Sequence, residues 1–228
     1  MSASREDASP AGRRRGMMWL QVALLLGVLV ACEKKDATGP SDPAEARFLI
    51  EHNARFNDGH TVRWEDLPIP IYTAGIAREG EVTEWTRVTG GRVTFAFVGS
   101  PPGRGISFGF GGGDDVCGVT TVEFTDDGQI LSAEIRVVES VYRGPFCQRT
   151  VEHEVAHALG FLDHTADGTL TDPDGGNGRI SEEVVAFFNN LYSFEPGTRV
   201  RAGEIQRGVV RRGAGGRRVI TIVDPIRR

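Results

Sequence analysis

The chain has 228 residues, a formal net charge of −5 at pH 7 and a hydrophobic content of 39%. These values are typical of one globular domain with appended segments. The acidic excess argues against nucleic acid as a partner, because a nucleic-acid site requires a concentration of positive charge.

Residues 1–32 have the pattern of an export signal. Arg13–Arg15 form a basic segment, and Met17–Val30 is an apolar run that is too short for a comfortable membrane span. The run ends in Leu29–Cys32, LVAC, which resembles a bacterial lipobox. The resemblance implies cleavage before Cys32, lipid attachment to its sulfur, and a lipid-anchored protein of the bacterial cell envelope, periplasmic or on the outer surface. An ordinary secretory signal and a short membrane anchor are the alternatives.

Residues 33–45 are polar and include two prolines, which predicts a flexible linker. This linker is too short to contain a sizeable inhibitory propeptide ahead of the fold. We expect the main domain at 46–197 and a basic C-terminal extension at 198–228.

Alternating apolar residues in the first half of the domain predict strands, and one stretch predicts a helix. The first expected strand lies within His60–Tyr72 and ends near Tyr72, and the expected helix spans Ile76–Val88. Four more strands are expected at Arg92–Val98, Ile106–Phe110, Val119–Phe124 and Ile130–Val138. The turn at 126–128 would close a hairpin between the last two strands. We expect the rim loop Gly109–Gly113 and the strand Ile130–Val138 to border a substrate cleft.

Two cysteines remain once Cys32 is assigned to the lipid. Cys117 and Cys147 of an exported protein most simply pair as a disulfide. Such a bond would join the start of the hairpin to the segment just ahead of the next predicted helix. The alternative is a free Cys117 thiolate that binds, as an inhibitory ligand, to the metal ion that the histidine motif described next is expected to hold.

The stretch Thr150–Asp167, TVEHEVAHALGFLDHTAD, contains three of the five histidines. His153 and His157 are four residues apart, so on a helix they lie on one face within reach of one metal ion. Glu154 borders that face and can accept a proton from a water that the metal activates. Gly160 favours the left-handed conformation that ends a helix and reverses the chain. The pattern H-E-x-x-H is typical of zinc hydrolases.

A catalytic zinc site needs a third protein ligand and one position free for water. Asp163 and His164 follow the glycine turn, and either can supply that ligand. Imidazole is the commoner zinc ligand, which favours His164 and leaves Asp163 to orient a histidine ring.

The motif resembles that of the metzincin clan of metalloproteases, HExxHxxGxxH. His153, Glu154, His157 and Gly160 match it, and the clan's third ligand falls on Asp163, one place before the histidine. The stretch GFLDHTADG also resembles bacterial matrixin-like proteins in which one residue is inserted before the third histidine. The resemblance implies an α+β fold, with a mixed, mostly β upper sheet packed on an active-site helix and a small C-terminal subdomain that contains one helix.

The segment after the third histidine departs from the clan, because it lacks the methionine expected beneath the metal. Leu170 is the apolar residue that could take that place. Asp172, Asp174 and Asn177 have an imperfect calcium-loop spacing, which leaves a polar turn and a Ca2+ site as alternatives.

A helix and a basic tail complete the chain. Ser181 is a suitable N-cap, and apolar spacing carries the helix to Tyr192, which we expect to pack rather than to act at the metal. The tail 198–228 has nine arginines against two acidic residues, and Val219–Val223 could form one strand. We expect a solvated extension, with binding to anionic envelope polymers or to the acidic domain as the alternative.

Together these patterns predict a lipid-anchored zinc metalloendopeptidase that cleaves peptides or proteins. We expect it to be a monomer and not to bind nucleic acid. The expected zinc ligands are His153, His157 and His164, with Glu154 as general base. A lipid-anchored protein that holds zinc without catalysis, and a zinc amidase that acts on cell-wall material, are the alternatives.

Overall fold

The computed structural model describes most of the main domain and part of the tail. The described residues are 42–113, 115–139, 147, 149–173, 176–201 and 216–225, all within the unit 37–228. The predicted lipidation site at Cys32 lies outside them. None of the helices in these ranges is long and apolar enough to cross a membrane.

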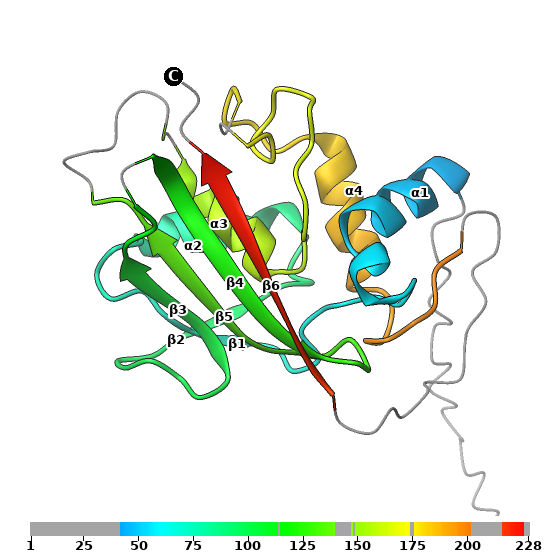
Figure 1. Ribbon diagram of the computed structural model, residues 1–228, viewed down its shortest axis with the longest axis horizontal. Helices are drawn as coiled ribbons and strands as arrows, with labels where there is room; N and C mark the ends of the chain where they lie inside the picture. The colour runs from blue at the N-terminus through cyan, green and yellow to red at the C-terminus, as the bar shows by residue number, and fades with distance from the viewer. Residues whose placement is uncertain are drawn as a thin grey trace, which may run out of the picture. The chain divides into compact units, whose positions relative to one another are not determined.

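A mixed sheet forms one side of the described structure (Figure 1). Its six strands are β1 (Ile69–Tyr72), β2 (Phe95–Phe97), β3 (Gly105–Phe110), β4 (Val116–Thr125), β5 (Ile130–Val137) and β6 (Arg217–Pro225). The strand order is β2-β1-β3-β5-β4-β6. β1, β2, β3 and β5 are parallel, and β4 runs antiparallel to both β5 and β6. The α+β class and the mixed sheet therefore agree with the sequence prediction.

The described ranges contain four α-helices. They are α1 (Pro43–His52), α2 (Glu79–Val88), α3 (Thr150–Ala158) and α4 (Glu182–Leu191), and a short 3-10 helix spans Ala54–Asn57. Ser181 caps α4 as predicted. α1 begins inside the stretch that we predicted to be linker, because the Asp42 side chain accepts a hydrogen bond from Ala44 N at 2.8 Å and caps it. α1 and α4 lie together beside the sheet (Figure 1).

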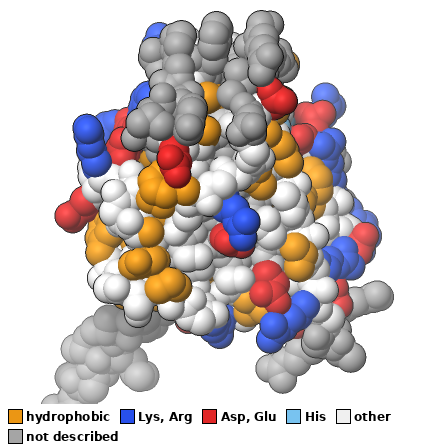
Figure 2. All heavy atoms as spheres, turned by 60° about the vertical axis from the view of Figure 1, so that its left-hand side comes forward, with side chains coloured by type: hydrophobic (Ala, Val, Ile, Leu, Met, Phe, Trp, Pro, Cys, Tyr) orange, Lys and Arg blue, Asp and Glu red, His pale blue; other side chains and the backbone are white. Residues whose placement is uncertain are grey.

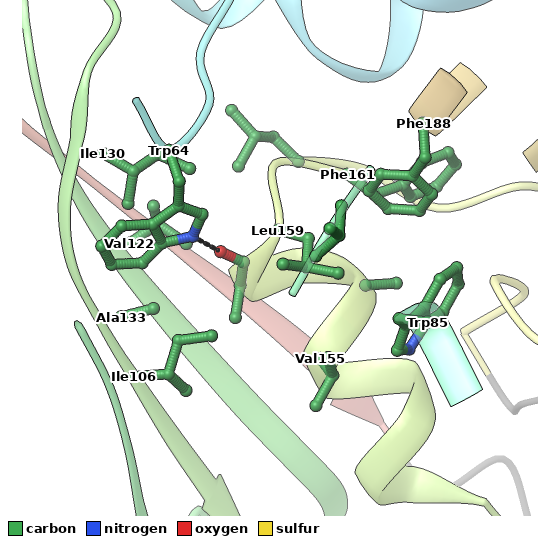
Figure 3. Packing of buried hydrophobic residues seen from close by; sticks show 14 of the residues in the cluster. Trp64, Trp85, Ile106, Val122, Ile130, Ala133, Val155, Leu159, Phe161 and Phe188 are labelled. Atoms are coloured by element: carbon green, nitrogen blue, oxygen red, sulfur yellow. Dashed lines mark hydrogen bonds between the residues drawn. The ribbon is translucent and has the colours of Figure 1, made fainter. Parts of the chain in front are cut away.

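The core lies between the sheet and α3. Figure 3 shows the side chains that pack there, which include Trp64, Ile106, Val122, Ile130, Ala133, Val155 and Leu159. Val155 and Leu159 are fully buried, and their spacing of four residues places them on one face of α3. Aromatic rings extend this core toward α4, where the centroids of Trp85 and Phe188 are 4.9 Å apart. Burial of each such side chain contributes roughly 1.5–3 kcal/mol.

The predicted cleft border at Ile130–Val138 is wrong. β5 lies between β3 and β4, so both of its backbone edges are already paired. The strand that lies against α3 and next to the end of the sheet is β4. Its outer edge is paired with β6 over the register from Val116 with Pro225 to Thr125 with Arg217.

β6 brings part of the predicted extension into the sheet. Ile220 and Ile222 pack against the core, whereas Val219 and Val223 are 65% and 46% exposed. This alternation is that of a strand with one buried face. Residues 217–225 are therefore not a solvated tail. On the face drawn in Figure 2, hydrophobic side chains are scattered among charged side chains of both signs.

Asn53 joins three parts of the chain that are distant in sequence. Its fully buried amide nitrogen donates to the carbonyls of Val62 and Gly160, each at 2.7 Å, and its Oδ1 accepts from Val62 N at 2.8 Å. These bonds fix the turn after α3 against the segment that follows α1.

We expect Asn53→Ala to lower the free energy of unfolding by about 2–4 kcal/mol, because two buried carbonyls and one buried N–H lose their partner. Denaturant titration would measure the loss. Asn190→Ala is the control: its half-buried amide has one bond, to Glu45 at 3.0 Å, and should cost less than about 1 kcal/mol. Equal losses for the two variants would contradict this role of Asn53.

Candidate metal centre

The helix α3 is fixed against the sheet and against α2 by contacts at its first turn. Cys117 of β4 and Cys147, ahead of the helix, form the expected disulfide, with a Cα–Cα distance of 5.2 Å. Arg149 caps the helix in a left-handed conformation, with φ of 59°, and its guanidinium contacts Glu84 of α2 and Glu152. The disulfide also removes Cys117 as a thiolate ligand.

Two carbonyl groups orient the histidines of α3. His153 Nδ1 donates to the carbonyl of Leu170, and His157 Nδ1 donates to that of Phe161. A carbonyl only accepts, so both Nδ1 atoms carry the proton and both Nε2 atoms present a lone pair when the rings are neutral. The two Nε2 atoms are 2.9 Å apart. Leu170, the residue that we expected in place of the missing methionine, thus contacts the centre through its backbone carbonyl.

The chain reversal at Gly160 carries the third histidine to the same place. Gly160 has a φ of +108°, and a Cβ there would lie 2.6 Å from the carbonyl oxygen of Val62, so this turn requires glycine. The rings of His164 and His157 are then 4.8 Å apart between centroids. Asp163 points elsewhere and pairs with Arg55, so it neither joins the cluster nor orients a ring of it.

A fourth donor comes from β6. Asp224 is 1% exposed, and its carboxylate contacts all three rings. Its Oδ2 is 3.1 Å from His153 Nε2, its Oδ1 is 3.8 Å from His157 Nε2, and Oδ1 also contacts His164 Nε2. The position that we expected to be free for water therefore faces a protein carboxylate.

The four groups could hold a metal ion. One ligand atom from each lies within 4.8 Å of the others. Tetrahedral zinc, with bonds of roughly 2.0–2.2 Å, would separate its ligand atoms by about 3.3–3.6 Å, and the distances of 2.9, 3.1 and 3.8 Å lie on either side of this range. A proton on one imidazole ring could form a hydrogen bond to only one of these neighbouring ligand atoms. A cation would satisfy the convergent lone pairs together with the Asp224 carboxylate.

Glu154 lies fully buried on the sheet side of the centre. Its Oε2 accepts from the hydroxyl of Thr120 at 2.5 Å, and its carboxyl group also contacts Asp224. Burial, and next the charge of Asp224, raise the pKa of Glu154 well above its usual value. The carboxylate occupies the space beside Gly118, where a Cβ would lie 1.9 Å from Oε1.

The protonation states of two groups, His157 and Asp224, suit metal binding. At His153, burial lowers the pKa but the charge of Asp224 and a hydrogen bond to it raise the pKa by more, so a metal would have to displace a proton from this ring. Burial lowers the pKa of His157 from 6.5 to about 4, so this ring is neutral at pH 7 and offers a lone pair. Burial raises the pKa of Asp224, but contacts with Glu154 and His153 lower it by more, and the net direction is downward. Asp224 is therefore an ionised donor.

Three residues of the centre were not found from the sequence: Asp224, Thr120 and Gly118. The alternating run Val219–Val223 ahead of an aspartate was the available signal for Asp224. Alternation along β4 places Gly118 and Thr120 on one face, but only the three-dimensional structure shows that this face meets Glu154.

Two further candidates lie away from the cluster. The Tyr192 hydroxyl donates to the carbonyl of Leu159 at 3.0 Å, which fits the expected packing role. Asp172 accepts from Gly168 N at 3.3 Å, and Asp174 lies outside the described residues. The alternatives of a polar turn and a Ca2+ site at Asp172, Asp174 and Asn177 therefore both stay predictions.

Comparison with known proteins adds no relative to this description. No protein-family model, no curated protein and no solved structure matches the chain. The centre is therefore interpreted from its own geometry.

We expect His164→Ala to weaken Zn2+ affinity by at least about 100-fold, because loss of a direct ligand should exceed the 10–100-fold cost of changing an outer contact. Competition with a chromophoric chelator would measure the affinity. Asp163→Ala is the matched control and should keep wild-type affinity, since Asp163 pairs with Arg55. The reverse result would make Asp163 the ligand.

Gly118→Ala should destabilise the protein by about 1–3 kcal/mol, because the new methyl group overlaps the Glu154 carboxylate. A double-mutant cycle tests the cause. In a Glu154→Ala background the same substitution should cost much less, since the overlapping atoms are gone. An unchanged cost in that background would place the clash elsewhere.

Proposed function

We propose that the chain is a zinc-dependent endopeptidase of metzincin, matrixin-like type. The observation that carries the proposal is the convergence of three Nε2 donors beside the buried carboxylate of Glu154. Three imidazole ligands and an adjacent carboxylate are the protein groups that a catalytic zinc site uses. The donor set favours zinc, because imidazole with one carboxylate in a four-coordinate arrangement suits this ion.

Each residue of the centre has a defined role in this proposal. His153, His157 and His164 would hold the ion, with the Leu170 and Phe161 carbonyls fixing the first two rings. The ion supplies Lewis-acid activation of water and of a scissile carbonyl when bound. Glu154 would accept the water proton and deliver it to the leaving amine. The Thr120 hydroxyl holds Glu154 on the metal side of β4.

The proposal includes export. The N-terminal basic and apolar segments with Cys32 support a lipid-anchored protein of the cell envelope that acts on peptide or protein substrates. The disulfide between Cys117 and Cys147 supports an oxidising compartment.

A second function is favoured by one observation. Asp224 completes a set of four protein donors, and closed four-ligand sites are typical of structural zinc. A metal-containing binding protein without catalysis is therefore the competing proposal. Glu154 argues against it, because a purely structural centre has no use for an additional buried carboxylate whose ionised form is costly.

Glu154→Gln tests the enzyme directly. We expect the variant to retain one Zn2+ per chain and to cleave an unfolded protein substrate about 10²- to 10⁴-fold more slowly than wild type, since it cannot accept a proton. Metal analysis and kcat/KM on the purified chain are the measurements. Glu134→Gln, an exposed change on β5, should leave both unchanged. The same comparison is made in an Asp224→Ala background, which removes the fourth protein donor. Equal rates with and without Glu154→Gln in both backgrounds would contradict the hydrolase assignment.

A further inference from the structure

The outer edge of β4 is the surface that an extended peptide would need. A peptide binds a sheet by adding a strand to an unpaired edge, and β4 is the strand whose edge runs beside α3. In the described structure this edge is fully paired with β6 (Figure 1). The other end of the sheet is β2, which is separated from β4 by three strands.

β6 also closes the metal centre. It runs antiparallel to β4, with Ile222 opposite Thr120 and Asp224 opposite Gly118. Its inward face places Ile222 over the core and the next inward residue, Asp224, against the three histidines. One segment of nine residues thus covers both the peptide-binding edge and the fourth metal position.

We propose that β6 is an inhibitory peptide built into the chain, and that the centre opens when this strand leaves β4. The inference rests on the proposed function, and it adds the regulation of that site. The ligand that β6 imitates is an extended peptide that pairs antiparallel with β4 and presents a carboxylate to the metal. Substrates of the same backbone form compete with β6 for this edge.

The contacts of β6 are compatible with a strand that is held but can be released. At its start, Arg217 pairs with Glu123 at 2.9 Å, and Arg218 pairs with Asp126 at 2.7 Å and Asp58 at 2.8 Å. These pairs are partly exposed to solvent, and solvent-exposed ion pairs contribute little to stability. The strand is a sheet edge with one solvated face, so its loss would leave the other strands paired as they are.

A permanent structural role for Asp224 is the rival explanation. It does not account for Glu154, a second carboxylate that lies fully buried in contact with Asp224. It also does not account for the open flank of the centre. His164 is 17% exposed at its side chain and borders a surface depression of about 380 Å³, together with His52 and Arg55.

The closing experiment uses the full chain loaded with Co2+, whose visible spectrum reports its ligands, and acetohydroxamate, a small ligand that needs a free metal position. We expect Asp224→Ala and the isosteric Asp224→Asn to retain Co2+ and to bind acetohydroxamate about 10- to 100-fold more tightly than wild type. Folded variants that lose Co2+ would make Asp224 a required ligand. Wild-type protein that binds the probe equally well would show that the position is not blocked. Either result would overturn the proposal.

A second pair of variants leaves all metal donors in place. Ile222→Ala weakens the inward packing of β6, whereas Val223→Ala changes the exposed neighbour. We expect Ile222→Ala alone to bind acetohydroxamate more tightly and to exchange the amide hydrogens of β6 faster. Wild-type behaviour of Ile222→Ala in both measurements would overturn the role of the strand.

Peptide cleavage by the same proteins separates the two proposals. Faster cleavage by Asp224→Ala and Ile222→Ala than by wild type supports both. A centre that opens to acetohydroxamate in these variants but never cleaves peptide supports closure by β6 and removes the endopeptidase function. Wild-type cleavage at the rate of the variants keeps the function and removes the inhibition.

Discussion

The structure depends on the convergence of three imidazole lone pairs and one carboxylate in a water-poor interior. His153 and His157 face each other at an Nε2 separation of 2.9 Å, which neutral rings do not tolerate without a positive charge between or beside them. The helix, the Gly160 turn and β6 each bring one part of this set. Removing these polar groups from water costs free energy, and the packing of the surrounding fold must offset that cost to keep them together.

The second layer around the centre determines what it can do. Carbonyls of Leu170 and Phe161 fix two rings, and β4 contributes Thr120 and the space beside Gly118. Without that space the Glu154 carboxylate would have to leave its position next to the metal site. A single glycine on a strand is thus as necessary to the proposed chemistry as the motif on the helix.

Local signals could be predicted from the sequence, and long-range pairing could not. The spacing of the histidines predicted a helix that carries them on one face, and the two cysteines predicted their disulfide. Asp224 was missed because it lies 60 residues beyond His164 and reaches it only through pairing of two strand edges. Edge pairing is set by register and packing across the sheet, which a single strand's own residues do not encode. The start of α1 was missed for a different reason, since a polar, proline-containing stretch gives the same pattern in a linker and at a capped helix start.

The bond between Asp224 and the cluster has a thermodynamic consequence. A metal that uses this carboxylate binds more tightly when β6 is paired, and by reciprocity β6 pairs more tightly when the metal is present. Ion and strand would thus each increase the affinity of the domain for the other. A low concentration of the ion would weaken the pairing of β6 with β4. The metal concentration in the surrounding solution, and not only the amino-acid sequence, would then determine how stably β6 is bound.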